Sequence, residues 1–442
     1  MIELLVVWFC LLMALIVFAI GRPRQPGALT LAYFIGMSLI HVPGAFVYAW
    51  DPNLQDAEPS LIGFELTVLG FAAFALGAIV GKIMLGRKTK SLLPGEENIS
   101  AHKDLRLRLS SLNMVVIGIA IYFGVMPISR DIPSATAVLQ PFSSLLILGL
   151  WVRLYASEYF SAGRYTLPTL AIALPVMPIA TLAAQGIINY GVSWTISTAS
   201  FLFIMYRRRS RVYVFAPVVV FLGMSMFVTY MGQRDVLREL IWQQQAGISA
   251  RLNRISDMIT QFHIVNFKNF DDQTAILIRL NQNFFVGSAV QRHESGLSSF
   301  AYGTTVQPSA FIPRVFWPDK PEIGGGRSVV ADFTGLVLST TSSWGAGQTL
   351  EFYINFGVIG VFVGFFGLGF LLMWLDHGLM SALSKGDVRE MLIFGLPGLT
   401  LLQPGGNLLE IMVGAVAAVL VAFTASFFFQ RIETTQIALG FK

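Results

Sequence analysis

The ionisable side chains best suited to chemistry gather in one stretch of the chain, between residues 292 and 327. A guanidinium group binds phosphate oxygens through paired hydrogen bonds, and a diphosphate contact needs two or three such groups to converge. For each arginine taken alone, a place at the surface or in an ion pair is the commoner role. The charged residues that stand out are Arg292, His293, Glu294, Arg314, Asp319, Lys320 and Arg327.

Two short motifs in this stretch have both a chemical and a plain structural interpretation. His293 is followed by Glu294 and can be a base oriented by a carboxylate, but neighbours in sequence do not share a face of a helix or strand. The triple glycine 324–326 precedes Arg327 and can form a nest of backbone N–H groups that binds an anion. A flexible turn is the commoner use of such a run, so neither motif alone predicts a site.

Few ionisable residues lie inside the apolar segments, and these lie towards one membrane face. His41, Glu65, Glu351 and Glu410 are all in the outer parts of predicted membrane spans. Ionisable groups inside a membrane are functional candidates by default. None of the four is near the bilayer centre, where a proton-coupled transporter needs one. The polar chemistry is therefore expected at the outer membrane boundary.

The composition predicts a helical membrane protein. Of the 442 residues, 55% are hydrophobic and 12% are charged, and the mean hydropathy is +0.66, whereas soluble domains have about a quarter charged residues. The apolar runs lack the alternation of β-barrel strands. Cys10 is the one cysteine, so no disulfide within the chain is possible. Motifs for metal or nucleotide binding are absent from the sequence, and no metal and no cofactor is expected.

The apolar runs predict about eleven transmembrane helices, because about 20 apolar residues span a bilayer as a helix. The first run, 4–20, lacks a basic start and is expected to be a retained span and not a signal peptide. The expected fold class is an all-α polytopic membrane protein with one large extracytoplasmic loop. The expected helices are 3–20, 27–50, 61–85, 112–126, 137–156, 166–186, 189–206, 212–231, 349–375, 388–403 and 408–430.

The positive charges of the short connections predict the orientation. Nineteen of the 30 Lys and Arg residues lie in connections on one side of the predicted bundle, whereas the short loops on the other side hold only Arg130. We therefore expect the N-terminus outside, the C-terminus in the cytoplasm and the long loop outside. The expected divisions are 1–231 (helices one to eight), 232–348 (the large extracytoplasmic, periplasmic loop), 349–430 (helices nine to eleven) and 431–442 (cytoplasmic tail).

The long loop 232–348 has two parts of different character. In 233–291, apolar residues recur three, four or seven apart, which predicts amphipathic helices on the membrane surface, with Asp271 or Asp272 capping a second helix through 275–290. The part 292–348 contains four prolines and many aromatic residues, and it cannot be one long helix. Aromatic faces beside polar groups suit sugar recognition. The open alternative for both parts is a packed cap over the transmembrane bundle.

Several motifs in and beside this loop resemble those of the Wzy-type oligosaccharide repeat-unit polymerases, also called O-antigen polymerases. The strongest is the run Phe311-Ile312-Pro313-Arg314-Val315-Phe316-Trp317-Pro318-Asp319-Lys320-Pro321. The others are Tyr302-Gly303-Thr304, Gly232-Gln233-Arg234 and Leu350-Glu351-Phe352-Tyr353-Ile354-Asn355-Phe356-Gly357. The resemblance covers mainly residues 232–360 and implies a GT-C-like glycosyltransferase of the bacterial inner membrane. Such an enzyme moves a growing glycan from undecaprenyl diphosphate onto a lipid-linked repeat unit outside the cytoplasm.

The motif match marks Arg234, Arg314, Lys320 and Glu351 and does not assign their chemistry, so the roles of individual residues are our own hypotheses. The expected diphosphate ligands are Arg234, Arg314 and Arg327, followed by Arg292 and Lys320. The expected proton acceptors are His293, Glu294 and Glu351, with His41 a weaker candidate, and the expected sugar-stacking residues are Tyr302 and Trp317. The expected partners are undecaprenyl-diphosphate-linked glycans, the lipid bilayer and a chain-length regulator, but no nucleic acid.

Three other functions compete with this one. An O-antigen ligase uses the same donor with a different acceptor, and the sequence does not separate the two. A transporter or flippase for lipid-linked glycans is less favoured, because the two halves show no matching broken spans. A non-catalytic scaffold of an envelope polysaccharide machine is the third alternative.

Overall fold

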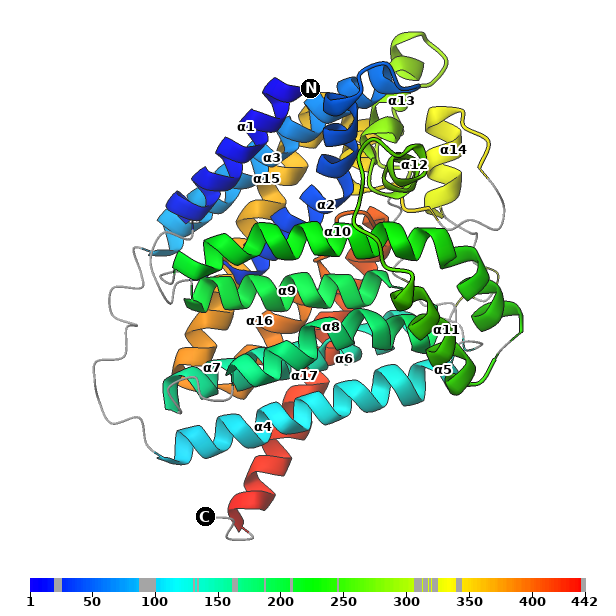
Figure 1. Cartoon of the computed structure of the whole chain (residues 1–442). Coiled ribbons are helices and arrows are strands. Elements are labelled where there is room, and N and C mark those ends of the chain that lie inside the picture. Colours follow the sequence, from blue (N-terminus) through cyan, green and yellow to red (C-terminus); the bar gives the residue numbers. More distant parts are fainter. Residues whose placement is uncertain are drawn as a thin grey trace.

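The structure is a computed structural model that describes residues 1–19, 26–86, 101–129, 132, 135–160, 166–186, 188–206, 210–244, 246–305, 312, 317, 319, 325–338 and 344–438. Within these residues every regular element is a helix (Figure 1). The first half contains α1 (Ile2–Ala14) with a π-helical end (Leu15–Ala19), α2 (Ala28–Trp50), α3 (Ala57–Gly86), α4 (Ala101–Ile119) with a π-helical continuation (Ala120–Val125), α5 (Met126–Ile128), α6 (Ala135–Ser143), α7 (Leu145–Phe160), α8 (Thr166–Gln185), α9 (Asn189–Tyr206) and α10 (Ser210–Arg238).

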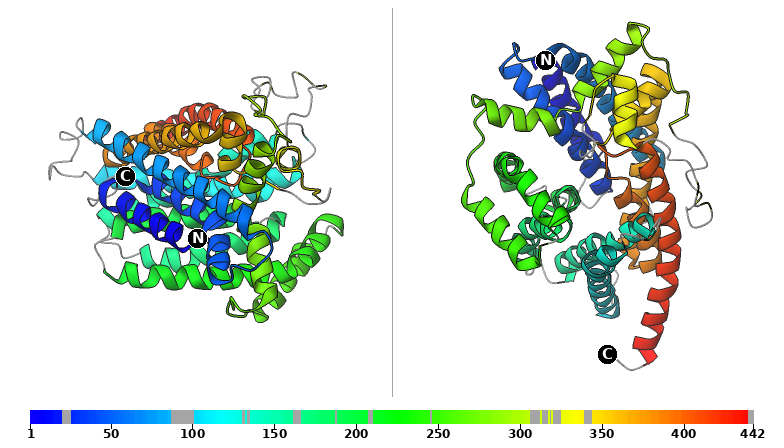
Figure 2. Two further views of the ribbon diagram at one scale, coloured as in Figure 1. Left: turned by 90° about the horizontal axis from the view of Figure 1, so that it is seen from above. Right: turned by 90° about the vertical axis from the view of Figure 1, so that its right-hand side faces the viewer.

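The remaining helices belong to the long loop and the C-terminal part. They are a π-helical segment (Glu239–Gln243), α11 (Ile248–Thr260), α12 (Phe270–Arg279), α13 (Asn283–Glu294), α14 (Gly326–Thr334), α15 (Gln348–Lys385), α16 (Val388–Thr400) and α17 (Leu408–Ala438). Figure 1 shows α11 to α14 at the side of the molecule where α10 ends, and the right-hand view of Figure 2 looks onto this side.

The described residues contain six helices that are long and apolar enough to cross a membrane, which makes this a helical membrane protein. They lie at Ala28–Trp50, Ala57–Gly86, Arg106–Ile128, Val138–Glu158, Gln348–Lys385 and Leu408–Phe429. Shorter apolar helices occupy Ile2–Phe18 and Val176–Gln185. The count of eleven spans and the orientation of the termini stay predictions.

Close helix contacts in the bundle depend on small residues, as is usual in membranes. A Cβ atom at Gly77 of α3 would overlap the carbonyl of Phe366 in α15, and one at Gly369 of α15 would overlap the carbonyl of Phe74 in α3. The two helices therefore pack backbone against backbone. Gly357 has a positive φ of 62° and produces a kink in α15, so that the first nine residues of this helix turn towards the loop.

The prediction of one continuous helix through 275–290 is wrong, because the structure has two helices there, α12 and α13. Asn269, and not Asp271 or Asp272, caps α12: its Oδ1 accepts hydrogen bonds from the N–H groups of Asp271 (2.8 Å) and Asp272 (3.4 Å). The helix ends at Arg279, and α13 begins at Asn283. No proline or glycine lies at this break, so its cause is tertiary.

The break between α12 and α13 completes the backbone hydrogen bonds of α2. Pro43 interrupts the ladder of α2, since proline lacks an N–H group. Gly44 donates its N–H to the carbonyl of Leu280 (3.1 Å), and Gln282 donates its N–H to the carbonyl of Ile40 (3.0 Å). The missing side chain of Gly44 leaves the space that Asn281 fills. The loop is thus tied to α2 through main-chain bonds.

The start of α13 is held by a buried polar group of three side chains. Oδ1 of Asn283 lies 2.7 Å from Nδ1 of His41 and accepts a hydrogen bond from Thr67 (3.2 Å), and its amide donates to the carbonyl of His41 (2.7 Å). The helix also packs closely on α3, where Gly287 meets the carbonyl of Pro59. Helix α13 is therefore buried against the bundle, which corrects the expectation of a surface helix. His41 takes part in this anchor.

Candidate functional site

Three arginine side chains converge where α10 and α12 end, and we call them the arginine cluster. Arg234 and Arg238 lie one turn apart on α10, and both interact electrostatically with the side chain of Tyr230, which is buried. Arg279 is the last residue of α12, and its charge interacts with both of the others. Residues four apart share one face of a helix, so Tyr230, Arg234 and Arg238 lie along one face of α10.

Burial and mutual repulsion lower the pKa values of two arginines in this cluster. The pKa of Arg279 is lowered to about 10, first by burial and then by the charges of Arg234 and Arg238. The pKa of Arg238 is also lowered, by burial and by Arg234. A pKa of about 10 leaves Arg279 charged at neutral pH. A bound anion would remove the repulsion between them, which is the usual reason for arginines to converge in a binding site.

Arg234 retains a hydrogen-bond donor for such an anion. Its Nη1 donates to Oδ1 of Asp235 (3.1 Å), whose side chain is 91% exposed, while the Arg234 side chain is only 11% exposed. Its Nη2 is buried and has no hydrogen-bond partner within the described residues. A buried guanidinium donor without a partner is costly. The geometry therefore suits a phosphate oxygen at Nη2.

Trp344 positions Arg279 from the opposite side. The guanidinium carbon of Arg279 lies 4.2 Å from the centre of the Trp344 ring. The indole ring in turn meets Phe285 edge to face, at 5.4 Å between ring centres. A cation over an aromatic face is stabilised by the ring quadrupole, so the segment before α15 holds the side chain of Arg279 in place.

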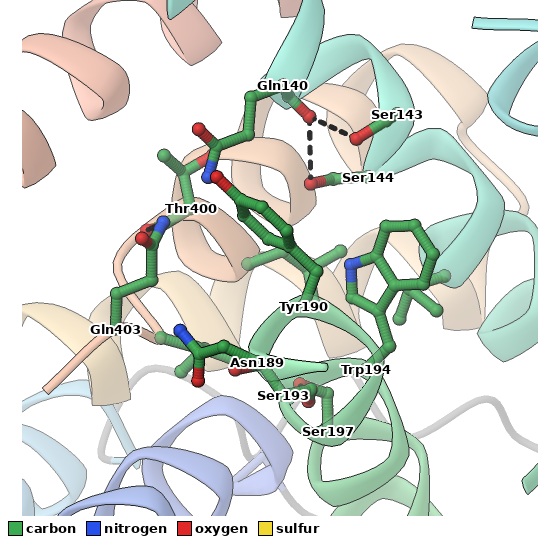
Figure 3. A pocket seen from close by; sticks show the side chains of 13 residues that line it. Gln140, Ser143, Ser144, Asn189, Tyr190, Ser193, Trp194, Ser197, Thr400 and Gln403 are labelled. Carbon is green, nitrogen blue, oxygen red and sulfur yellow. Dashed lines mark hydrogen bonds between the residues drawn. The ribbon is translucent and has the colours of Figure 1, made fainter. Parts of the chain in front are cut away.

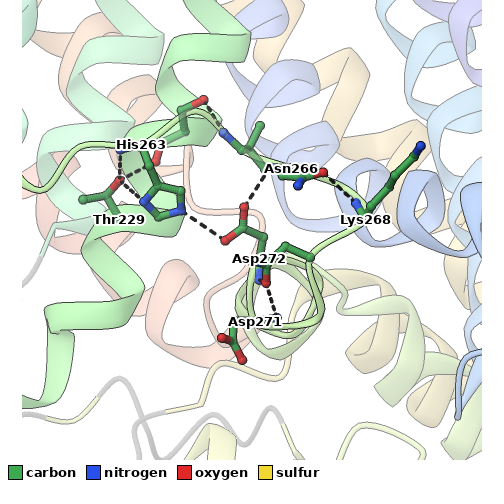
Figure 4. A network of polar contacts seen from close by, with 9 residues as sticks. Thr229, His263, Asn266, Lys268, Asp271 and Asp272 are labelled. Carbon is green, nitrogen blue, oxygen red and sulfur yellow. Dashed lines mark hydrogen bonds and ion pairs between the residues drawn. The ribbon is translucent and has the colours of Figure 1, made fainter.

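A histidine–aspartate pair connects the segment after α11 to the first turn of α12 (Figure 4). Nε2 of His263 is 3.1 Å from Oδ1 of Asp272, and the other carboxylate oxygen accepts the N–H of Asn266 (2.7 Å). Asp272 is buried, with 6% of its side chain exposed, while the imidazole of His263 is 50% exposed. A carboxylate that holds one ring nitrogen fixes the tautomer of the histidine.

The free nitrogen of His263 is left as a proton acceptor by its surroundings. Nδ1 lies 3.5 Å from Oγ1 of Thr229, but this hydroxyl donates its own proton to the carbonyl of Ser225 (3.0 Å). When Nε2–H donates to Asp272, Nδ1 carries the lone pair. The half-exposed ring can then take a proton from a hydroxyl that approaches it.

The histidine–aspartate pair and the arginine cluster both involve residues of α10 and α12. On α10, Thr229 beside His263 is the chain neighbour of Tyr230 at the cluster. On α12, Asp272 and Arg279 are seven residues apart, which is two turns on one face and a rise of about 10 Å. The histidine–aspartate pair and the arginine cluster therefore lie about two helical turns apart along α12.

The predicted diphosphate ligands do not all meet. Arg234 belongs to the arginine cluster. Arg292 is on α13, with its guanidinium packed against the backbone of Gly335, and Arg327 is exposed in the first turn of α14. Arg314 and Lys320 lie outside the described residues. The structure therefore places one first-choice ligand in the cluster and reveals two arginines, Arg238 and Arg279, as its other members.

The predicted proton acceptors His293 and Glu294 lie at the end of α13. The Nδ1–H of His293 donates to the carbonyl of Ser298 (3.1 Å), and its ring packs on Phe300 at 4.0 Å between ring centres. Glu294 is exposed and is the last residue of the helix. The imidazole of His293 is thus fixed by a backbone carbonyl, and Glu294 has no part in orienting it.

The third predicted proton acceptor and the predicted sugar-stacking residues lie around α15. Glu351 is buried and accepts the N–H of Leu408, the first residue of α17, at 2.7 Å. Tyr302 is 71% exposed in a turn with φ 47° and lies 6.0 Å from Phe300 between ring centres. Trp317 is 39% exposed. Tyr302 is therefore accessible for stacking, whereas Glu351 caps the start of α17.

Sequence reasoning missed Arg238, Arg279, His263 and Asp272. The spacing of Arg234 and Arg238 was a usable signal, because residues four apart share a face once α10 is extended beyond residue 231. The spacing of Asp272 and Arg279 was a second signal on α12. Within the described residues, no group of three His, Cys, Asp or Glu side chains is arranged to hold a metal ion.

The comparisons with known proteins assign no residue of the site. No protein-family model, curated protein or solved structure matches the chain.

Proposed function

We propose that the chain is a membrane glycosyltransferase that polymerises undecaprenyl-diphosphate-linked oligosaccharide repeat units into a surface polysaccharide. The observation that supports this most is the convergence of Arg234, Arg238 and Arg279 at the end of α10. A lipid diphosphate carries the multiple negative charge that three guanidinium groups bind best. Its polyprenyl chain stays in the bilayer beside the apolar helices, so the substrate reaches the cluster laterally.

In the proposed reaction the arginine cluster stabilises the leaving group. The bond between the anomeric carbon of the donor glycan and the diphosphate oxygen breaks, and its electron pair stays on the diphosphate. An acceptor hydroxyl of a second lipid-linked repeat unit forms the new glycosidic bond to that carbon. Preorganised donors aimed at the developing charge lower the barrier most effectively in a half-buried site, which is the situation of Arg234 and Arg279.

The proton of the acceptor hydroxyl goes to Nδ1 of His263 in this proposal. Asp272 holds Nε2–H and stabilises the imidazolium that forms. The hydroxyl of Thr229 directs its proton away, to Ser225. The histidine thereby takes the role that we expected from the sequence for His293, Glu294 or Glu351. The products are released undecaprenyl diphosphate and a lipid-linked glycan that is longer by the transferred units.

The predicted GT-C-like arrangement belongs to the same proposal. The reaction takes place at the outer face of the bacterial inner membrane, with the N-terminus outside and the C-terminus in the cytoplasm, because the positive charges of the short connections gather on the opposite side from the long loop. No nucleotide sugar takes part, since the lipid diphosphate activates the donor. A chain-length regulator is a proposed partner.

The test is the length of the surface glycan in cells that lack the native gene. Wild-type protein should restore a ladder of long chains. Arg238→Gln or Arg279→Gln at the same protein level should leave mainly single repeats. Arg389→Gln, an exposed change on α16, is the matched control and should restore the ladder. A full ladder with both cluster variants would refute the arginine cluster as the donor site.

The acceptor separates this proposal from a ligase, which binds the same donor. If purified protein with lipid-linked repeat units alone produces longer lipid-linked chains, the acceptor is a second repeat unit. If no elongation occurs and glycan appears only on an added lipid A-core acceptor, the protein is a ligase. Movement of the substrate between leaflets without a new glycosidic bond would identify a flippase.

A further inference from the structure

Tyr302 is held in an exposed turn with a backbone conformation that tyrosine rarely adopts. Its φ is 47°, and the residue is 71% exposed. A positive φ brings the Cβ atom too close to the backbone, so glycine or asparagine is the usual residue in such a place. Strain of this kind persists only where surrounding contacts impose it, and it gathers at functional sites. The turn therefore presents the tyrosine ring to solvent at a cost in stability.

Hydrogen bonds to the first segment of α15 impose this turn. The N–H of Ala301 donates to the carbonyl of Ile354 (2.7 Å), and the N–H of Gly303 donates to Oδ1 of Asn355 (2.8 Å). Asn355 is buried, and its own amide donates to the carbonyl one turn earlier in α15 (2.7 Å). The residues on both sides of Tyr302 are thus fixed, and its side chain is left accessible.

Aromatic rings from α13, the turn and α15 gather around Phe300. The centre of its ring lies 6.0 Å from that of Tyr302, 6.0 Å from that of Tyr353 and 4.0 Å from that of His293. The kink of α15 packs closely on the same ring, since a Cβ atom at Gly357 would lie 3.2 Å from Cζ of Phe300. We call His293, Phe300, Tyr302 and Tyr353 the aromatic shelf.

His293 adds a hydrogen-bond acceptor to the aromatic shelf. Its Nδ1 lies 3.1 Å from the carbonyl of Ser298, which can only accept, so Nδ1 carries the proton. In the neutral imidazole the lone pair is then on Nε2. Glu294 is exposed, and its charge interacts with Tyr353, which brings carboxylate oxygens to the edge of the shelf. The shelf therefore combines ring faces with acceptors for hydroxyl protons.

This combination fits a neutral sugar better than an anion or an acyl chain. A sugar ring has a C–H face that packs on an aromatic face, and its hydroxyl groups donate to imidazole and carboxylate acceptors. The carboxylate of Glu294 repels a phosphate group. An acyl chain leaves the polar groups of His293 and Tyr302 without partners.

The enclosed pocket between α6, α7, α9 and α16 does not offer such a site (Figure 3). Tyr190 and Trp194 of α9 line it, but its volume of about 30 Å³ holds only one or two water molecules. A sugar ring does not fit there, whereas the aromatic shelf is open on the side of Tyr302.

We propose that the aromatic shelf binds a neutral sugar residue of the glycan, with the sugar ring on Tyr302 and one hydroxyl donating to Nε2 of His293. The inference rests on the proposed function for the identity of that glycan. It extends the stacking role expected for Tyr302 and gives His293 a binding role instead of a catalytic one. The shelf holds part of the sugar chain while the diphosphate is bound at the arginine cluster.

The affinity for a free oligosaccharide tests the shelf separately from catalysis. The probe is the oligosaccharide released by mild acid from the lipid-linked pool of the producing cells, and saturation-transfer NMR on purified protein in detergent measures its Kd. Tyr302→Asn should weaken the affinity about 5-fold, whereas Tyr302→Phe keeps a ring and should stay within about 2-fold of wild type. Phe270→Ala is the matched control and should leave the affinity unchanged, because Phe270 is also 71% exposed but lies at the start of α12.

Thermal unfolding separates a binding role of Tyr302 from a purely structural one. Asparagine adopts a positive φ more readily than tyrosine, so Tyr302→Asn should keep or raise the Tm while it weakens binding. His293→Phe keeps a ring against Phe300 but lacks Nε2, so it should weaken the affinity about 3-fold. A lower Tm of Tyr302→Asn with unchanged affinity would overturn the shelf, as would unchanged affinity in both variants.

Binding of undecaprenyl diphosphate separates the failure of this inference from that of the proposed function. Tyr302→Asn should bind this bare lipid as the wild type does, whereas Arg238→Gln should bind it more weakly. If wild-type protein binds the bare lipid but not the oligosaccharide, the shelf is overturned and the proposed function stands. If it binds the oligosaccharide in a manner that depends on Tyr302 but does not bind the lipid, the shelf stands and the proposed function fails.

Discussion

Arg279 lies over the indole ring of Trp344, with 4.2 Å between the guanidinium carbon and the ring centre. The two residues lie in different parts of the long loop, since Arg279 ends α12 and Trp344 precedes α15. The contact therefore joins the arginine cluster to the entry of α15. It also keeps the planar guanidinium group in one orientation, as a bidentate phosphate contact requires.

Trp344 should contribute to donor binding without touching the lipid itself. Trp344→Leu removes the aromatic face and should weaken binding of undecaprenyl diphosphate roughly 2- to 10-fold, because such a contact is worth about 0.5–1.4 kcal/mol. Trp344→Phe keeps a face for Arg279 and should retain most of the affinity. Titration of purified protein with the lipid measures both. The exposed change Trp50→Leu is the control, and an equal loss in the Phe and Leu variants would contradict the role of the ring face.

Donor binding should weaken at high pH because the pKa of Arg279 is lowered to about 10. Below that pH the side chain is charged and attracts the diphosphate, whose own protons are lost above about pH 6. Above it the ligand-free protein loses this charge, so the affinity should be constant from pH 8 to 9 and should decrease as the pH rises through about 10. In Arg279→Gln the affinity should be lower at pH 8 and should decrease less between pH 9 and 11. The same decrease in both proteins would contradict this assignment.

Features that depend on local sequence could be predicted, whereas features that depend on contacts with distant residues could not. Apolar length alone predicts the helical membrane class, and the prolines and glycines of 292–348 predict that no long helix forms there. The end of α12 was not predictable locally, because it depends on main-chain bonds from Leu280 and Gln282 to α2. Asn269 as the cap of α12 was within reach of local reasoning, since asparagine is among the preferred capping residues.

The site was predictable only in part for the same reason. The resemblance singled out Arg234 through its own local motif. Arg238 and Arg279 meet it because α10 continues past the predicted boundary and packs against α12, which no local pattern specifies. The pairing of His263 with Asp272 across nine residues similarly depends on a turn of the chain that also involves Thr229 and Asn266.

The proposed base predicts different effects for two neighbouring aspartates. Asp272→Asn should retain the contact to the N–H of Asn266 but hold His263 in the wrong tautomer, so transfer should slow roughly 100-fold or more. Binding of undecaprenyl diphosphate should not change. Asp271→Asn alters an exposed side chain beside it and should leave the rate unchanged. Single-turnover transfer on purified protein measures the rate, and equal rates for the two variants would remove His263 from the reaction.

Two substitutions of Glu351 test whether its carboxylate has a structural or a catalytic role. Its Oε1 accepts the N–H of Leu408 at the start of α17 (2.7 Å), and a carboxylate there also interacts favourably with the helix dipole. Glu351→Gln retains an acceptor oxygen and should preserve the polymer ladder. Glu351→Ala removes the cap and should destabilise the protein by about 0.5–2 kcal/mol.

The readouts for Glu351 are thermal unfolding in detergent and the glycan ladder at matched protein level. A lower Tm in the Ala variant, with the ladder intact in the Gln variant, supports a structural role at the junction of α15 and α17. If Glu351→Gln folds with the wild-type Tm and gives only single repeats, the carboxylate takes part in the chemistry. In that case the acceptor proton goes to Glu351, one of the proton acceptors expected from the sequence, and His263 is a structural contact between α10 and α12.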